Sequence, residues 1–215
     1  MKNYKYILLD WDDNLAQTLG LWLDVFKQVL AEEGFNPTNE EIAASFGKVV
    51  DYFASLGIKD PLGLYEKADE IGRAKLPDAE LYPDVLEVLA YFKEIGKKTA
   101  LISASNRANI EPSLDKYGMR NLFDVVITRE DTTKQKPDPE SLFTALKALG
   151  GNADQAILIG DSDKDLGAAQ NAGMDSILFY PPEHAKFYDI DKLKLLKPTF
   201  VVDGFTEIMS IVQRT

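Results

Sequence analysis

Five short apolar runs lack the alternation of apolar and polar positions that a half-exposed strand shows. They span residues 6–9, 99–103, 125–128, 156–159 and 176–180, and residues 199–202 are a further candidate. Strands of a parallel sheet typically have such unbroken apolar runs, because helices cover both faces of the sheet and neither face meets water. The runs therefore predict buried parallel strands.

Stretches with apolar side chains at helical spacing separate these runs. Helices are expected over residues 84–94, 109–117, 139–149 and 166–172, the last followed by Gly173, a typical helix stop. Strands that alternate with helices indicate an α/β fold. Right-handed crossovers then give a doubly wound, Rossmann-like parallel sheet.

Residues 15–79 interrupt the alternation, because they contain no strand-like run. Helices are expected from Leu15 to Gly34, from Glu40 onward, near 49–56 and over 62–75. We therefore predict an α/β core domain formed by residues 1–14 and 80–215. Residues 15–79 would form a small all-helical domain inserted after the first strand.

Composition narrows the class of protein. The net charge of −11 argues against nucleic acid and anionic membranes as partners. The chain has no cysteine, which excludes disulfides and thiolate chemistry. Its one histidine, His184, rules out a multi-histidine metal site and is expected in a surface loop. No apolar stretch reaches the ~20 residues of a membrane span, and no signal-peptide pattern opens the chain, so a cytoplasmic protein is expected.

Polar residues follow the predicted strands at their carboxyl ends. In YILLDWDDNLAQT, three carboxylates come directly after the first strand, and such close charges repel unless a cation lies among them. The residues expected together at this edge of the sheet are Asp10, Asp12, Ser103, Lys136, Asp161 and Asp165.

These residue types suit phosphoryl transfer. Asp10, Asp12 and Asp161 offer oxygen ligands only, which favours a hard cation such as Mg2+. Lys136 and the Ser103 hydroxyl are donors for phosphoryl oxygens. Asp10 can act as the nucleophile and Asp12 as the general acid and base.

The same segments resemble the haloacid dehalogenase superfamily, whose members are mostly phosphatases. LLDWDDNL resembles its first motif, DxDx[TV], and TALISAS resembles the second, a strand that ends in Ser or Thr. KPDPESL resembles the lysine-bearing third motif, and LIGDSDKD followed by AAQNAGM resembles the fourth. All four occur in order, and the resemblance covers nearly the whole chain.

The resemblance implies that Asp10 attacks phosphorus and forms an aspartyl-phosphate. Asp12 would protonate the leaving oxygen and then activate water, while Ser103 and Lys136 hold the phosphoryl oxygens. Residues 15–79 resemble the helical cap of the family, which closes over the site.

The resemblance also implies a magnesium site. Its ligands would be the Asp10 carboxylate, the backbone carbonyl of Asp12 and Asp161, and Asp165 would support a metal-bound water or Lys136. Asn14 and Asp13 depart from the pattern, which usually has Thr or Val and often Gly at these positions. Asn14 can still form a local hydrogen bond, and the acidic Asp13 is expected to be tolerated.

Further candidates lie around the phosphate and in the helical segment. Ala104 and Asn106 follow Ser103 and are expected close to the phosphate, with Asn106 and Arg107 opening the next helix. Lys48, in SFGKVV, is expected to contact the substrate, and Arg73 is a weaker candidate.

Other conspicuous side chains are expected to have ordinary roles. Trp22 and Phe26 are assigned to the helical core rather than to a substrate platform, and Trp11 to packing beside the nucleophile. Lys134 is expected to be solvated, because Lys136 fits the motif.

The sequence thus favours a magnesium-dependent phosphatase acting on a small phosphorylated metabolite, such as phosphoglycolate, a sugar phosphate or a nucleoside monophosphate. The dehalogenase branch of the superfamily fits poorly, because its members lack the second aspartate of the first motif, whereas this chain has both Asp10 and Asp12. A phosphomutase of the beta-phosphoglucomutase type is an alternative, although AQTLGLWLDVF has no histidine for that role. A non-catalytic binding or regulatory protein is a second alternative, and the departure of Asn14 from the motif supports it. The sequence leaves open whether the protein is a monomer or a dimer.

Overall fold

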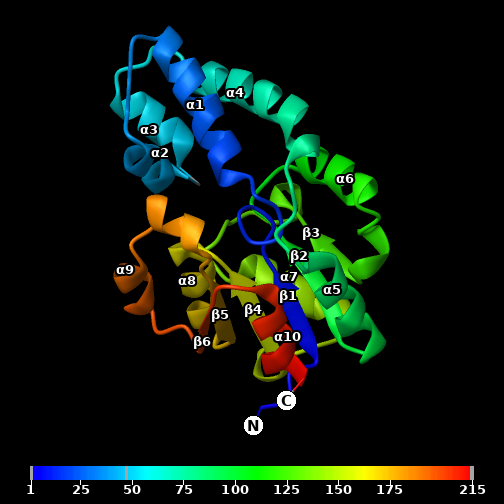
Figure 1. The fold of residues 1–215 in the computed structure, drawn as a ribbon. Coiled ribbons are helices and arrows are strands. Elements are labelled where there is room, and N and C mark those ends of the chain that lie inside the picture. The colour runs from blue at the N-terminus through cyan, green and yellow to red at the C-terminus, as the bar shows by residue number, and fades with distance from the viewer. Residues whose placement is uncertain (1, 47, 214–215) are drawn as a thin grey trace.

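The computed structural model describes residues 2–46 and 48–213, and its centre is a sheet of six parallel strands in the order β3-β2-β1-β4-β5-β6 (Figure 1). The strands are β1 (Tyr6–Leu9), β2 (Lys98–Ile102), β3 (Val125–Ile127), β4 (Ala156–Gly160), β5 (Asp175–Phe179) and β6 (Phe200–Val202). Each lies within one residue of its expected bounds, and every pairing is parallel. The predicted α/β fold is confirmed.

Helices cover both faces of this sheet. Helices α5 (Val85–Glu94), α6 (Arg107–Lys116) and α10 (Phe205–Gln213) pack on one face, while α7 (Glu140–Leu149) and α8 (Asp163–Ala172) pack on the other. Successive residues of β1 therefore enter different cores. Ile7 and Leu9 belong to the first and Leu8 to the second, and all three are fully buried. This double burial explains why the strand sequences show no alternation.

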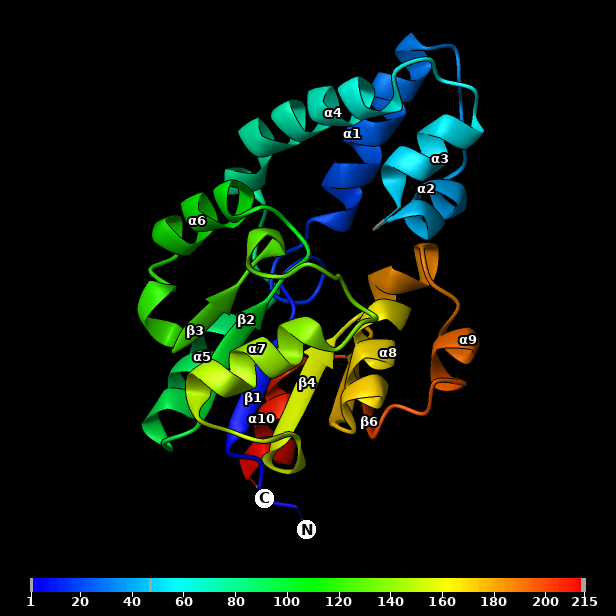
Figure 2. The same ribbon diagram turned by 180° about the vertical axis from the view of Figure 1, so that it is seen from behind.

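Four helices lie beyond the carboxyl edge of the sheet and cluster together (Figures 1 and 2). They are α1 (Leu19–Glu32), α2 (Asn39–Ser45), α3 (Val49–Ser55) and α4 (Pro61–Lys75). They share a hydrophobic core of their own, which includes Phe26, Ile42 and Phe53. The division into domains at residues 15 and 79 stays a prediction.

Helix α1 begins later than its apolar spacing predicts. Leu15 lies before the helix and packs into the sheet-side core with Ala16. The backbone N–H groups of Asn14, Leu15 and Ala16 all point to the carbonyl oxygen of Trp11, so residues 11–16 form a compact turn. Helix α8 begins three residues earlier than expected, because Ser162 and Asp165 form a capping box at its start.

The remaining short elements connect these layers. Helix α9 (Ile190–Lys194) lies between β5 and β6. The 3-10 helices are η1 (Leu76–Asp78), η2 (Arg120–Leu122), η3 (Arg129–Asp131), η4 (Ala153–Gln155) and η5 (Pro182–Lys186). In residues 2–46 and 48–213, no helix has the length and apolar character that crossing a membrane requires.

Candidate active site

Lys136 connects two buried carboxylates at the carboxyl edge of the sheet. Asp10 follows β1 and Asp165 lies in the first turn of α8. Nζ of Lys136 lies 2.6 Å from Oδ1 of Asp10 and 2.5 Å from Oδ1 of Asp165. The Lys136 side chain is only 6% exposed. The ammonium group is therefore fixed beside the predicted nucleophile.

Asp165 is held from both sides. Its second oxygen, Oδ2, accepts hydrogen bonds from the Ser162 backbone N–H at 3.2 Å and from the Ser162 hydroxyl at 2.5 Å. The capping box of α8 thus orients the carboxylate that positions Lys136. We expected Asp165 to support either Lys136 or a metal-bound water, and its contact is with Lys136.

Two acids of this cluster, Asp10 and Asp161, have a pKa above that of an ordinary aspartate. Burial, followed by the nearby charge of Asp165, raises the pKa of Asp10 to about 7 despite the opposing effect of Lys136. Burial and the charges of Asp165 and Asp10 also raise the pKa of Asp161 well above its usual value. Burial alone would lower the pKa of Lys136, but Asp10 and Asp165 outweigh it and raise the pKa. The lysine is therefore cationic.

The single positive charge of Lys136 does not neutralise the three carboxyl groups around it. Carboxylate oxygens of Asp10, Asp161 and Asp165 lie within 4.8 Å of one another, and all three residues are buried. A hard divalent cation would stabilise them, and a set of oxygen donors suits Mg2+ better than a softer metal. The residues present therefore fit the predicted magnesium site.

Hydroxyl groups hold the Asp12 carboxylate. Oδ1 accepts a hydrogen bond from the Thr18 hydroxyl at 2.8 Å, and Oδ2 accepts one from the Ser105 hydroxyl at 2.6 Å. The Ser103 hydroxyl lies 3.3 Å from Oδ2 and also accepts a hydrogen bond from the Ser105 backbone N–H. Burial raises the pKa of Asp12, although the hydroxyls of Ser105 and Thr18 oppose this. We had not singled out Thr18 or Ser105, even though Ser105 is the second serine of TALISAS.

Asn14 makes the local hydrogen bond that its amide allows. It is completely buried, and its Nδ2 donates to the backbone carbonyl oxygen of Asp10 at 3.0 Å. Its Oδ1 has no partner among the described residues. The side chain therefore stabilises the nucleophile loop, which is compatible with an active enzyme.

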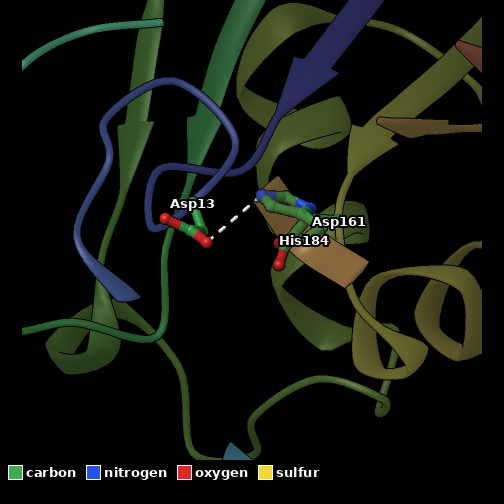
Figure 3. A group of neighbouring side chains, drawn as sticks. All are labelled: Asp13, Asp161 and His184. Atoms are coloured by element: carbon green, nitrogen blue, oxygen red, sulfur yellow. Dashed lines mark ion pairs between the residues drawn. The ribbon is translucent and has the colours of Figure 1, made fainter. Parts of the chain in front are cut away.

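The prediction that His184 lies in a surface loop is wrong. His184 lies in η5, has no exposed surface and is surrounded by aromatic rings, including those of Tyr82, Phe179 and Tyr188. Its Nε2 lies 2.9 Å from the Tyr82 hydroxyl and 3.2 Å from Oδ2 of Asp13. Figure 3 shows this pair with Asp161 beside it. The residue is buried because η5, which follows β5, folds back over the carboxyl edge of the sheet.

Asp13 has a structural role beyond being tolerated. Its φ of 55° lies in the left-handed region, which explains why glycine suits this position. Its Oδ1 accepts a hydrogen bond from the Leu19 backbone N–H at 3.1 Å, at the start of α1, while Oδ2 faces His184. Asp13 therefore connects the nucleophile loop both to the helical segment and to η5.

A cavity of about 190 Å³ lies between the sheet edge and helices α1–α4. Asp10, Asp12, Lys136 and Asp161 contribute to its wall from the sheet side. Of the residues expected near the phosphate, Ala104 and Asn106 also line it, whereas Ser103 does not. Ser105 takes the place on the wall that we expected for Ser103.

Some of the residues that we considered in the helical segment line the cavity, and others do not. Trp22 and Phe26 belong to the helical core, as expected, and both also line the cavity. Lys48 is exposed and lines a neighbouring groove instead, so its role as a substrate contact stays a prediction. Arg73 is outside the wall and forms an ion pair with Asp69, which lines it.

The residues with expected ordinary roles have them. Trp11 is buried in the sheet-side core. Lys134 is exposed, with Nζ 3.3 Å from Asp138 Oδ2. Arg107 opens α6 and pairs with Asp131 at 2.6 Å.

Comparisons with known proteins agree with this geometry. A family model described as "Haloacid dehalogenase-like hydrolase" matches residues 7–179. A Clostridium perfringens protein provisionally named pyrophosphatase PpaX is 30% identical, over 98% of each chain. Pyrophosphatase PpaX of Bacillus cereus is 29% identical, over 96% of this chain and 95% of its own. A crystal structure from Lactobacillus plantarum, provisionally described as a phosphoglycolate phosphatase, matches the fold with a TM-score of 0.83, 22% identity and coverage of 97% and 99%.

Proposed function

Because the chain belongs to the haloacid dehalogenase-like hydrolases, we propose that it is a magnesium-dependent phosphatase that hydrolyses a small phosphomonoester through an aspartyl-phosphate on Asp10. The observation that carries the proposal is the Asp10 carboxylate in the cavity wall, with the Lys136 ammonium 2.6 Å away and Asp12 in the same wall. This supplies a nucleophile, a fixed positive charge and an acid in one cavity.

In the first half of the reaction, a carboxylate oxygen of Asp10 attacks phosphorus and the bond to the leaving oxygen breaks. Asp12 gives its proton to that oxygen, so that the alcohol leaves neutral. The raised pKa of Asp12, which follows from burial, favours the protonated form that this step needs. Hydrogen bonds from Thr18 and Ser105 keep its carboxyl group in place.

In the second half, Asp12 takes a proton from a water molecule, whose oxygen attacks phosphorus. The bond to Asp10 breaks, phosphate leaves and both carboxyl groups return to their starting state. Lys136, which lines the cavity, is the donor best placed to bind phosphoryl oxygens, and Ser103 stays the second expected donor. The single proton of the Ser105 hydroxyl is already donated to Asp12, so Ser105 positions that acid instead.

Asp10, Asp161 and the backbone carbonyl of Asp12 would hold the magnesium ion. When bound, it supplies positive charge to the phosphoryl oxygens and to the acidic cluster. Asp165 stays with Lys136 in this arrangement, as its contact of 2.5 Å indicates.

The names of the relatives make inorganic pyrophosphate a second candidate substrate, hydrolysed by the same chemistry. The mutase and the non-catalytic alternatives have less support. His184, the one histidine of the chain, is enclosed by aromatic rings and bonded to Tyr82 and Asp13. The Asn14 side chain supports the nucleophile loop, so its presence no longer speaks for an inactive protein.

The test is phosphate release from p-nitrophenyl phosphate, phosphorylated metabolites and pyrophosphate, with Mg2+ and with a chelator. We expect release that depends on Mg2+ in the wild type and is absent in Asp10→Asn. Asp163→Asn is the matched control, because Asp163 is an exposed acid near the site without a role in the mechanism. Release that survives in Asp10→Asn, or that ignores the chelator, would overturn the proposal.

A further inference from the structure

Among the residues that the structure describes, the part of the cavity wall that comes from the helical segment carries no positive charge. Thr18 and Leu19 contribute to it at the start of α1, and its other side chains are aromatic, apolar or acidic: Trp22, Phe26, Phe46, Val49, Tyr65 and Asp69. The cations of the wall, Arg129, Lys136 and Lys164, come from the sheet side. Lys136 is already held by two carboxylates, and Arg129 is exposed to solvent. A leaving group that reaches the helical segment therefore meets rings and a carboxylate rather than a cation.

The aromatic side chains form a continuous surface. The rings of Trp22 and Phe26 are stacked, with centroids 5.6 Å apart and planes 22° apart. Phe46 continues the surface at 5.8 Å from Phe26. The indole of Trp22 also packs against Gly72 of α4, where a Cβ atom would lie only 2.4 Å from the ring. The close approach of α4 thus helps to fix the indole in place, and a flat aromatic ring is the kind of ligand group that stacks on such a surface.

Next to these rings, the wall offers hydrogen-bond acceptors. Asp69 is 6% exposed, its Oδ1 accepts a hydrogen bond from Nδ2 of Asn109 at 2.9 Å, and its Oδ2 pairs with Arg73. Because a carboxylate only accepts, this bond fixes the orientation of the Asn109 amide. Oδ1 of Asn109, in a residue that is 3% exposed and lines the cavity, is left without a partner among the described residues. A buried acceptor of this kind requires a donor.

We infer that the substrate is a nucleoside monophosphate whose base carries an amino group. The inference rests on the proposed phosphatase function and selects its substrate class. The base stacks on the surface formed by Trp22, Phe26 and Phe46, and its N–H donates to Oδ1 of Asn109. Pyrophosphate and phosphoglycolate, whose second group is an anion without a ring, gain neither contact.

Matched substrates test each part of the inference. Adenosine monophosphate is compared with purine riboside monophosphate, which lacks the amino group, with ribose 5-phosphate, which lacks the base, and with pyrophosphate. We expect kcat/KM for adenosine monophosphate to exceed that for ribose 5-phosphate and for pyrophosphate at least tenfold. Its advantage over purine riboside monophosphate should be about fivefold. Equal or higher values for ribose 5-phosphate or pyrophosphate would overturn the inference.

Variants test whether the preference for adenosine monophosphate over ribose 5-phosphate depends on the aromatic surface. Trp22→Leu should lower the ratio of kcat/KM for adenosine monophosphate to that for ribose 5-phosphate at least fivefold, and Trp22→Phe should restore most of it. Phe35→Leu is the matched control, because Phe35 packs against the same helical core outside the cavity wall and should leave the ratio unchanged. An unchanged ratio in Trp22→Leu would overturn the role of the surface.

Binding separates this inference from the proposed function. In Asp10→Asn, which has no nucleophile, adenosine monophosphate should quench the fluorescence of Trp22, and ribose 5-phosphate should not. The other tryptophan, Trp11, is buried in the sheet-side core, and the Trp22→Phe change in the same background identifies the source of the signal. Quenching without turnover of any substrate by the wild type would overturn the phosphatase proposal alone. Turnover of p-nitrophenyl phosphate without quenching would overturn the substrate class alone.

Discussion

Magnesium binding should weaken strongly as the pH falls from 8 to 6, because a proton competes for Asp10. Burial and the charge of Asp165 raise the pKa of Asp10 to about 7, from an ordinary value of 3.8. The ionised fraction of this carboxylate is then about nine-tenths at pH 8 and about one-tenth at pH 6. The dissociation constant for Mg2+ should therefore rise about tenfold, which is a loss of about 1.4 kcal/mol. Asp161, whose pKa is also raised, adds to this dependence.

The stability of the metal-free protein should also depend on the protonation of Asp10. The folded protein keeps a proton on Asp10 at pH values where the unfolded chain has lost it. The free energy of unfolding therefore falls as the pH rises from about 4 to about 7. Bound Mg2+ offsets this loss, since it stabilises the ionised carboxylate in the folded state only. A concentration of 100 times the dissociation constant contributes about 2.7 kcal/mol, or about 5–10 °C in Tm for a chain of this size.

The assay is calorimetric titration of Mg2+ at pH 6, 7 and 8, together with thermal unfolding in Mg2+ and in chelator at each pH. Asp165→Asn is the informative variant, because it removes the like charge that acts on Asp10 while an amide oxygen remains to cap α8. Its pH dependence should shift to lower pH. A dissociation constant that is equal at pH 6 and pH 8 in the wild type would refute the reasoning.

Three further changes test the surroundings of the site. Lys136→Met leaves two buried carboxylates without their cation and should cost about 3–5 kcal/mol in urea unfolding, and a cost below about 1 kcal/mol would contradict the ion pairs. His184→Ala opens a cavity and leaves the Tyr82 hydroxyl without its partner, so it should lower the free energy of unfolding by about 2–4 kcal/mol. Tyr82→Phe removes only the hydroxyl and should lower it by about 1 kcal/mol. Equal losses in the two variants would argue against a packing role for His184. Asn14→Thr removes an unpartnered amide oxygen and keeps a donor, so its stability should stay within about 1 kcal/mol of the wild type and phosphate release should persist. Loss of release in Asn14→Thr would show that the hydrogen bond to Asp10 needs the amide.

Positions along the strands could be predicted well, and positions of isolated polar residues could not. The strand bounds differ from expectation by at most one residue, because double burial imposes an unbroken apolar run. The start of α1 was wrong, since helical spacing cannot distinguish Leu15 in a turn from Leu15 in a helix. His184 was wrong for a similar reason. Its burial depends on Tyr82 and Asp13, which lie far away in the sequence.

By itself, the sequence determined the order of strands and helices, the family resemblance and the acids and lysine that lie together at the sheet edge. These depend on local patterns, and in a parallel sheet the end of each strand leads to the same edge. Only the tertiary structure decided which hydroxyls hold Asp12, that Lys136 pairs with Asp165, and that Asn109 meets Asp69 beside the aromatic wall. These contacts join separate elements, and their geometry follows from how helices pack on the sheet and on one another, which no local pattern encodes.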